Sequence, residues 1–118
     1  MLGNRSLTKE EKIMTKFMFA YHGGGGAPTD PAEAAAEMAK WEAWLGGMGQ
    51  NCHDFGAPVG MSKTVSAGSV ADNGGANPLS GYSIVEAASV EEACEMAKGC
   101  PIVESGSGTV EVAPIMEM

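Results

Sequence analysis

Positive charge is scarce in this sequence. Seven lysine and arginine residues stand against fifteen aspartates and glutamates, which gives a formal net charge of −8. Proteins that bind nucleic acid or anionic lipid neutralise phosphates with clustered basic side chains, and here the basic residues are scattered along the chain. We therefore expect neither nucleic acid nor a membrane surface among the partners of the protein.

Long hydrophobic segments are also missing. A transmembrane helix needs roughly 20 consecutive apolar residues, and no stretch of the chain approaches that length. The N-terminus also lacks the apolar region of a secretory signal peptide. The sequence accordingly predicts a cytoplasmic protein.

Cysteine is too sparse for a disulfide framework. The chain has three cysteines, Cys52, Cys94 and Cys100, and no CxxC pair. An odd number of cysteines does not fit a framework of paired bridges, and free cysteine is often buried as a small apolar residue. We interpret all three as reduced side chains that fill the core.

What the chain does contain suits one small globular domain. Its 118 residues are 44% hydrophobic and 19% charged, and a domain of this size buries about 65% of its unfolded surface. Seventeen glycines and nine methionines indicate many tight turns and an adaptable core. We expect the polar residues 1–13 to form a flexible leader, followed by a single domain of residues 14–118.

One stretch combines a strand pattern with a candidate catalytic side chain. The aromatic residues Phe17, Phe19 and Tyr21 alternate with other, mostly apolar residues, as in a strand that is covered on both faces. The strand ends at His22, and four glycines, Gly23–Gly26, follow it. Histidine exchanges protons in the neutral pH range. The sequence thus predicts a strand that presents an acid–base group at a loop.

The glycine-rich loop is like a phosphate-binding loop only in composition. It lacks the GK[ST] ending of a P-loop and the GxGxxG spacing of a dinucleotide fingerprint. Asp30 and Glu33 also place negative charge at the start of the following helix, where a phosphate would bind. We interpret the loop as a connector or a lid.

Capping signals and periodicity predict the remaining elements. Asp30, Pro31 and Glu33 mark the start of one helix, and Ser89 with Glu92 marks the start of a second. The predicted order is strand 17–22, helix 31–48, strands 51–55, 63–70 and 82–87, helix 90–97 and strand 109–115. This order predicts an α+β protein with a ferredoxin-like βαββαβ antiparallel sheet and two helices on one face.

The second face of the predicted sheet needs a cover. Two helices shield only one face, and the other face carries enough apolar side chains to leave a large exposed patch. A homodimer that closes this face is therefore expected, with an interface of more than ~1,000 Å² in total.

Several motifs resemble the YCII-related (DGPF-domain) family. They are Lys16-Phe17-Met18-Phe19 with Tyr21-His22-Gly23-Gly24-Gly25, Trp41-x-x-Trp44-Leu45, Ser62-Lys63-Thr64-Val65, Asn77-Pro78-x-Ser80-Gly81-Tyr82-Ser83-Ile84-Val85-Glu86-Ala87 and Lys98-Gly99-Cys100-Pro101. The resemblance covers about residues 14–118. It implies a ferredoxin-like fold whose subunits pair into a dimeric α+β barrel.

The resemblance also implies where a site would lie. Better-known YCII-like proteins place a histidine of a helix and an aspartate of a strand near a dimer cleft. This sequence departs from that pattern, because its first predicted helix has no histidine and carries Lys40 and Trp41 near the expected position. By residue type and rough position, His22 and Asp54 are the candidates for the acid–base pair.

Other polar residues are candidates for binding rather than catalysis. Ser62, Lys63, Ser80 and Tyr82 supply a cation and three hydroxyls, which suit the mouth of a pocket for a small polar molecule. Cys52, His53 and Asp54 are metal-ligand types, but neighbouring side chains of a strand point to opposite faces. We therefore expect no metal and no cofactor.

Two functions are compatible with these patterns. The first is a small-molecule enzyme in which His22 and Asp54 carry out acid–base chemistry in a cleft near the dimer interface. The alternative is a non-catalytic dimer that binds a metabolite or another protein. The acidic surface and the missing helical histidine favour the alternative, and the position of His22 favours the first.

Overall fold

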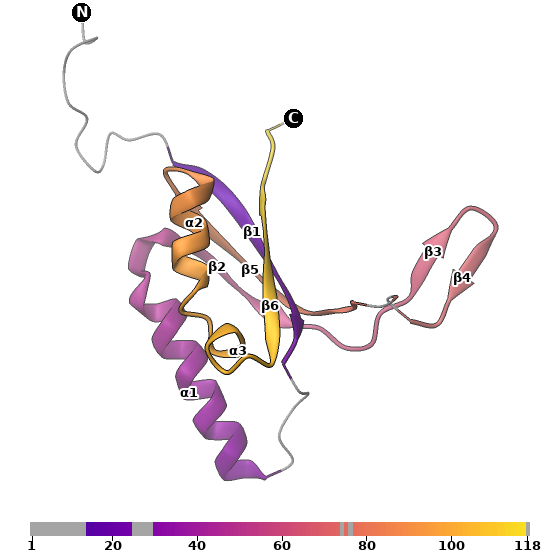
Figure 1. Ribbon diagram of the computed structural model, residues 1–118, viewed down its shortest axis with the longest axis horizontal. Coiled ribbons are helices and arrows are strands. Elements are labelled where there is room, and N and C mark those ends of the chain that lie inside the picture. The colour runs from indigo at the N-terminus through magenta and orange to yellow at the C-terminus, as the bar shows by residue number, and fades with distance from the viewer. Residues whose placement is uncertain (1–13, 25–29, 74, 76, 118) are drawn as a thin grey trace, which may run out of the picture.

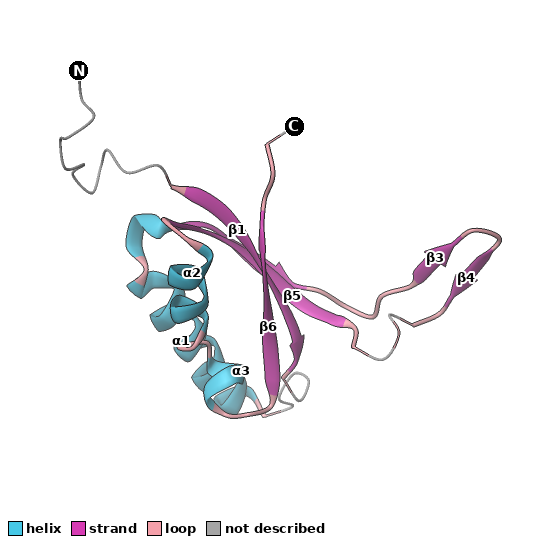
Figure 2. Cartoon of the chain, turned by 45° about the horizontal axis from the view of Figure 1, so that its top comes forward, coloured by secondary structure: helices cyan, strands magenta, loops and turns pink. Residues whose placement is uncertain are grey.

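The computed structural model describes residues 14–24, 30–73, 75 and 77–117. The predicted leader and Gly25–Gly26 of the glycine loop lie outside these residues. The described chain has an α+β fold in which helices cover one face of a four-stranded antiparallel sheet, as Figures 1 and 2 show. None of its helices combines the length and the apolar character needed to cross a membrane.

The elements alternate along the chain much as the sequence predicts. In order they are β1 (Thr15–Gly23), α1 (Pro31–Gly47), the short 3₁₀ helix η1 (Gly49–Asn51), β2 (Cys52–Pro58), β3 (Thr64–Ser66), β4 (Ser69–Ala71), β5 (Leu79–Ala87), α2 (Val90–Ala97), α3 (Pro101–Glu104) and β6 (Gly108–Pro114).

The main sheet has the strand order β2-β5-β1-β6. β1 pairs antiparallel with β5 from Thr15 to His22 and with β6 from Phe17 to Gly23. β2 pairs antiparallel with the outer side of β5. This order is compatible with the predicted ferredoxin-like arrangement, and it places the strand that bears His22 in the centre of the sheet.

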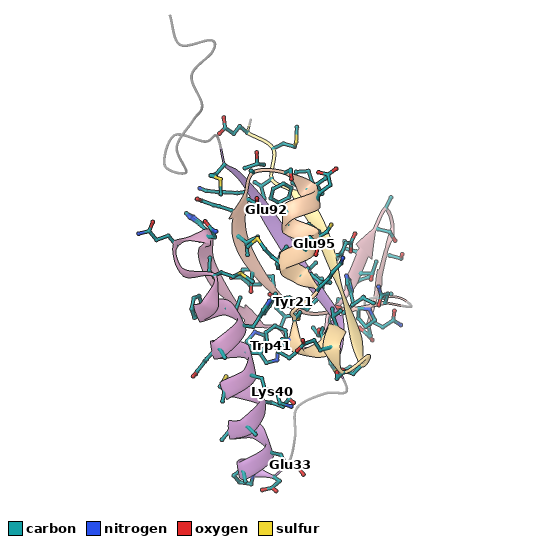
Figure 3. The ribbon with its side chains drawn as sticks, turned by 60° about the vertical axis from the view of Figure 1, so that its left-hand side comes forward. Tyr21, Glu33, Lys40, Trp41, Glu92 and Glu95 are labelled. Atoms are coloured by element: carbon teal, nitrogen blue, oxygen red, sulfur yellow. The ribbon has the colours of Figure 1, made fainter. Side chains whose placement is uncertain are left out.

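The core lies between the sheet and the helices. Phe17, Phe19 and Tyr21 of β1 point to the helices and are buried, and Trp41 and Trp44 of α1 pack against them. The Tyr21 and Trp41 rings meet edge to face with centroids 4.8 Å apart, as Figure 3 shows between α1 and the sheet. Both tryptophans are partly buried and belong to the edge of the core.

Both predicted helix starts are confirmed. Asp30 Oδ1 accepts a hydrogen bond from the Ala32 N–H at 3.1 Å, and Ser89 Oγ accepts one from the Glu92 N–H at 3.1 Å. The two helices differ in how they pack. α2 buries Ala93 and Ala97, whereas α1 buries only Leu45 fully, and Met38 in its middle is 61% exposed.

The prediction of a single strand at residues 63–70 is wrong. The segment forms a hairpin of two short strands, β3 and β4, that pair only with each other in a separate two-stranded sheet. The chain reverses at Gly68, whose φ of +82° favours glycine. The strand-favouring residues Thr64, Val65 and Val70 do lie in strands, but they are divided between two antiparallel strands.

A third helix was also missed. α3 begins at Pro101, which suits the first turn of a helix because proline has no N–H to leave unpaired. With α3 included, three helices lie on the same side of the sheet in Figures 1 and 2, where two were predicted.

Residues 59–73 form an arm that leaves the body of the protein. It follows β2, contains β3 and β4, and is exposed throughout except at Ser62. In both Figure 1 and Figure 2 the arm projects from the sheet on the side opposite the helices. The chain then returns to the sheet at β5.

Candidate functional site

His22 lies on the sheet face that the helices leave uncovered. Because side chains alternate along a strand, Tyr21 points into the core and His22 points away from it. The register places Met18, Ala20 and His22 of β1 beside Ile84, Tyr82 and Leu79 of β5 on this face. We call these six residues, with Glu111 of β6, the open face.

The His22 ring is held by three oxygen atoms. Its Nδ1 lies 2.9 Å from the carbonyl oxygen of Asn77 and 3.2 Å from that of Pro78, just before β5. Its Nε2 lies 3.0 Å from Glu111 Oε1. Only 7% of the residue is exposed, although it belongs to a face that no helix covers.

The partners of the ring limit the hydrogen bonds that it can donate. A neutral imidazole carries one N–H, whereas both nitrogens of His22 face acceptors, so only the doubly protonated ring donates to all sides. The charged ring would then form an ion pair with Glu111. The Glu111 side chain is 70% exposed and the His22 side chain only 8%, so Glu111 is the member of the pair that faces solvent.

Glu111 reaches His22 through the sheet register. Residue 111 stands beside Ala20, and Thr109 stands beside His22, so Glu111 and His22 are diagonal neighbours on adjacent strands. Diagonal pairs lie within reach of long side chains. Ala20, which stands beside Glu111, has a small side chain and leaves room for the glutamate side chain to extend toward the ring.

The structure does not bring Asp54 to His22. Asp54 is on β2, which is separated from β1 by β5, and it pairs with Ile84 beside Met18 rather than beside His22. The two residues are therefore about 13 Å apart along the strands and about 10 Å apart across them. The Asp54 carboxylate instead accepts a hydrogen bond from the Gly56 N–H at 2.8 Å.

This carboxylate supports a tight contact between strands. Gly56 has a φ of +71°, and a Cβ added to it would overlap the carbonyl oxygen of Tyr82. The pairing of β2 with β5 is irregular between Asp54 and Ala57. Asp54 thus holds an irregular turn of β2, and the acidic partner of His22 is Glu111.

The four predicted binding residues fall into two groups. Ser80 and Tyr82 are on β5, at the end of the sheet where His22 lies, and Tyr82 is on the open face. Ser62 and Lys63 belong to the arm, where Lys63 Nζ donates to Asp72 Oδ1 at 2.7 Å. The structure brings the first pair toward His22 and leaves the second pair on the arm.

The second histidine also has an acidic partner. His53 Nδ1 lies 3.5 Å from Glu86 Oε1, and both side chains are partly exposed. Glu86 is seven residues from Leu79 along β5, at the other end of the open face. Within the described ranges, no group of three or more histidine, cysteine, aspartate or glutamate side chains is placed to hold a metal ion.

The cysteines occupy three different environments. Cys100 is buried in the core, Cys52 is half-buried and Cys94 is exposed. Burial raises the pKa of the Cys100 thiol, and it raises the pKa of the Cys52 thiol together with the nearby Asp54 charge. The prediction that all three fill the core is therefore wrong for Cys94, while all three are free.

Two open, shallow hollows lie on the helix side of the described chain. One of about 280 Å³ lies between α2 and β6, beside Cys94, Val103 and Val110. Another of about 580 Å³ lies between α1 and α3, beside Trp44 and Pro101. Neither is lined by His22, so the His22 site is a surface of the sheet rather than part of either hollow.

Glu111 is the functional candidate that sequence reasoning missed. It is 89 residues from His22 in the sequence, and no local motif joins the two. A signal was nevertheless present, because a ferredoxin-like sheet places its first and last strands side by side, and Glu111 is the acidic residue inside the last predicted strand.

The fold and site together define a class of protein. It is an α+β domain with an antiparallel sheet, helices on one face, and an imidazole–carboxylate pair on the other. The profile of the YCII-related domain matches residues 4–118, essentially the whole chain, so the protein belongs to this family. A search of curated proteins returned no match.

Proposed function

We propose that the protein is an enzyme that acts on a small polar molecule, with His22 as its acid–base group on the open face. The observation that carries this proposal is the setting of the ring. His22 is almost fully buried at a sheet surface, anchored through Nδ1 by two backbone carbonyls, and paired through Nε2 with a carboxylate that is largely exposed.

This setting separates anchoring from chemistry. The Nδ1–H donates to backbone that is part of the β5 approach, so the ring keeps its orientation. Nε2 is the atom that gives or takes a proton, because its partner is a largely exposed side chain that a substrate group could displace. A bound substrate oxygen would replace Glu111 Oε1 at Nε2, and the proton would pass between that oxygen and the ring.

Glu111 takes the role that the sequence assigned to Asp54. A carboxylate that is hydrogen-bonded to an imidazole fixes the orientation of the ring. Ser80 and Tyr82 supply hydroxyls close to the same end of the sheet, where they would bind polar groups of the substrate. Ser62 and Lys63 join them only if the arm of one subunit approaches the open face of another.

A homodimer is part of this proposal. The open face exposes Met18, Leu79 and Tyr82, each more than a third accessible, and a second copy would remove them from water. It would also exclude water from the Nε2 side of His22, which strengthens electrostatic interactions there. Three free thiols suit the reducing conditions of the cytoplasm, where we place the protein.

One observation favours a second candidate, a non-catalytic dimer that binds a metabolite or another protein. Both ring nitrogens of His22 already have partners within the chain. In this candidate the histidine ties β6 and the start of β5 to β1, and its ion pair with Glu111 is structural.

The experiment that separates the two candidates follows substrate loss. An extract of small polar metabolites is incubated with the wild-type protein, with His22→Asn and with His53→Asn, and the compounds are quantified by mass spectrometry. Asparagine at position 22 can still donate to the carbonyls of Asn77 and Pro78, so the fold should be kept. His53→Asn is the matched control, because it removes the other histidine–glutamate pair.

We expect wild type and His53→Asn to consume one compound at similar rates. The rate with His22→Asn should be at least 100-fold lower, since a positioned acid–base group typically raises the rate of a reaction 10²–10⁴-fold. Equal consumption by all three proteins would remove His22 from the chemistry. Consumption by none of them, with a metabolite retained by the protein, would support the non-catalytic candidate.

A further inference from the structure

The hairpin of the arm has one apolar face and one polar face. Val65 and Val70 are directly opposite each other in the β3–β4 register, and they are 76% and 59% exposed. The neighbouring pairs, Thr64 with Ala71 and Ser66 with Ser69, point to the other side because side chains alternate along a strand. The two valines therefore form an apolar surface with no cover in the subunit.

The polar face of the arm is already satisfied. Ser66 Oγ and Ser69 Oγ are 2.7 Å apart, and Thr64 Oγ1 donates to the Asn73 carbonyl at 2.7 Å. The Lys63–Asp72 ion pair closes the base of the hairpin. Lys63 and Asp72 are each two positions from a valine, on the valine side of the alternation, so an ion pair borders the valine face, while the hydroxyls of the polar face bond to partners within the arm.

A hairpin of this kind needs a partner to be stable. An isolated two-stranded hairpin is marginally stable at best in water, and β3 and β4 make their close contacts chiefly with each other. A connection of this length inside a compact domain also usually has a function. An amphipathic hairpin without contacts to its own body is best explained by contacts to another molecule.

The position of the arm indicates which molecule that is. Figures 1 and 2 both show the arm standing out on the side of the sheet that the helices leave free. Any second copy laid against the open face would lie next to the arm. The chain from the arm returns to the sheet through Asn77 and Pro78, whose carbonyl oxygens hold His22, so the arm and the site are adjacent.

The area of the open face supports the same partner. Four strands ~4.8 Å apart and about seven residues long at ~3.3 Å each give a face of roughly 440 Å², so two faces in contact would remove on the order of 900 Å². Stable, specific interfaces bury about 1,200–2,000 Å² in total. The two sheet faces alone fall short, and two docked arms would supply the difference.

We infer that the arm of each subunit packs its Val65–Val70 face on a second copy of the chain. That copy covers the open face of the subunit that carries the arm, and the arm contacts it along the edge of this face. The inference rests on the homodimer of the proposed function. It adds the contact that makes the dimer stable, and it places the arm beside the His22 site of the assembled protein.

The test compares two substitutions at neighbouring positions of β4. Val70→Asp adds a charge to the apolar face of the arm, and Ala71→Asp adds the same charge to the polar face. Both residues are exposed in the subunit, so both variants should keep the circular dichroism spectrum of the wild type. The dimer dissociation constant of each full-length protein is measured by analytical ultracentrifugation.

We expect Val70→Asp to raise the dissociation constant at least tenfold and Ala71→Asp to change it less than threefold. A dimer that both variants leave equally tight would overturn the arm contact and leave the dimer of the proposed function in place. A concentration of 100 μM is about 100 times the dissociation constant of a micromolar dimer. A wild-type chain that stays monomeric at 100 μM would therefore overturn both the arm contact and the proposed dimer.

Hydrogen exchange gives a readout that needs no substitution. In the dimer, we expect the amides of β3 and β4 to exchange at least tenfold more slowly than in a sample diluted below the dissociation constant. Equal exchange rates in the two samples would show that the arm makes no contact in the dimer, and would also overturn the inference.

Discussion

The buried hydroxyl of Tyr21 links three strands of the sheet beneath the open face. Its hydroxyl donates to Ser83 Oγ at 2.7 Å, and Ser83 Oγ donates in turn to the Phe55 carbonyl at 2.7 Å. This chain of hydrogen bonds crosses from β1 through β5 to β2 beneath the open face. Burial raises the pKa of the Tyr21 phenol well above its ordinary value, although the Ser83 hydrogen bond partly offsets the shift.

The raised pKa predicts how stability depends on alkaline pH. In the unfolded chain the Tyr21 phenol should ionise near pH 10. In the folded protein the phenol keeps its proton at that pH. Above about pH 10 the unfolded state therefore binds fewer protons than the native state, and the free energy of unfolding falls as pH rises. Below pH 10 this contribution is constant.

The measurement uses Tyr82→Phe, which leaves Tyr21 as the single tyrosine of the chain. We expect no ionisation signal at 295 nm until the protein unfolds, so the absorbance and circular dichroism transitions should coincide. Replacing Tyr21 by Phe should remove the tyrosine-linked part of the alkaline loss of stability, at a cost of about 1 kcal/mol at neutral pH for the lost hydrogen bond. A phenol that titrates near pH 10 in folded Tyr82→Phe would contradict the prediction.

At the scale of elements, the sequence determines local structure better than contacts between distant strands. The caps at Asp30 and Ser89 and the alternation of Phe17, Phe19 and Tyr21 are local signals, and they placed both long helices and the central strand. The turn at Gly68 was missed because β-branched residues on both sides of it favour strands, whether the chain continues or reverses. The His22–Glu111 contact was missed because it depends on the register of β1 with β6.

The same reasoning explains why His22 was found without its partner. A histidine at the end of an apolar strand is visible in the sequence, whereas the choice between Asp54 and Glu111 depends on which strands are neighbours. Asp54 looked suitable because it also lies on a predicted strand. The intervening β5 and the hydrogen bond to Gly56 give it a different place.

The two helix caps should differ in their effect on stability. Replacing an N-cap residue by alanine typically costs about 1 kcal/mol. We expect Ser89→Ala to lower the free energy of unfolding by about this amount, because α2 buries Ala93 and Ala97 in the core. Asp30→Ala should cost less than about half of that, because the first half of α1 is largely exposed and its fraying opens little of the core.

Urea unfolding followed by circular dichroism measures both variants under the same conditions. Hydrogen exchange of the first turn of α1 should show increased opening in Asp30→Ala even where the urea midpoint hardly moves. Equal losses of stability in the two variants would mean that the first half of α1 packs as firmly as α2.

At the scale of the whole molecule, charge opposes assembly while apolar surface favours it. Each subunit carries a formal charge of −8, so two subunits repel each other at a distance. The charged residues of the open face, His22 and Glu111, form a pair, and His53 of β2 pairs with Glu86 of β5. In the proposed dimer the favourable part of the interface would therefore be apolar, and the unfavourable part would be long-range electrostatics.

The proposed dimer should consequently tighten as salt is added. Ionic strength shortens the range of electrostatic repulsion, from about 30 Å at 0.01 M to about 8 Å at 0.15 M. We expect the dissociation constant from analytical ultracentrifugation to fall severalfold between these two concentrations of sodium chloride. A dissociation constant that rises with salt would show that ion pairs between subunits dominate the interface.

The aromatic cluster between α1 and β1 gives the protein an intrinsic fluorescent probe. Trp41 and Trp44 are the two tryptophans of the chain, and both lie within about 6 Å of the Tyr21 ring. Their fluorescence therefore reports on the helix side of the sheet, and neither the open face nor the arm contains an indole. A ligand that binds in the hollow beside Trp44 should change the tryptophan emission, whereas one that binds beside His22 should leave the emission unchanged. A single spectrum can thus assign a newly found ligand to one side of the sheet before any variant is made.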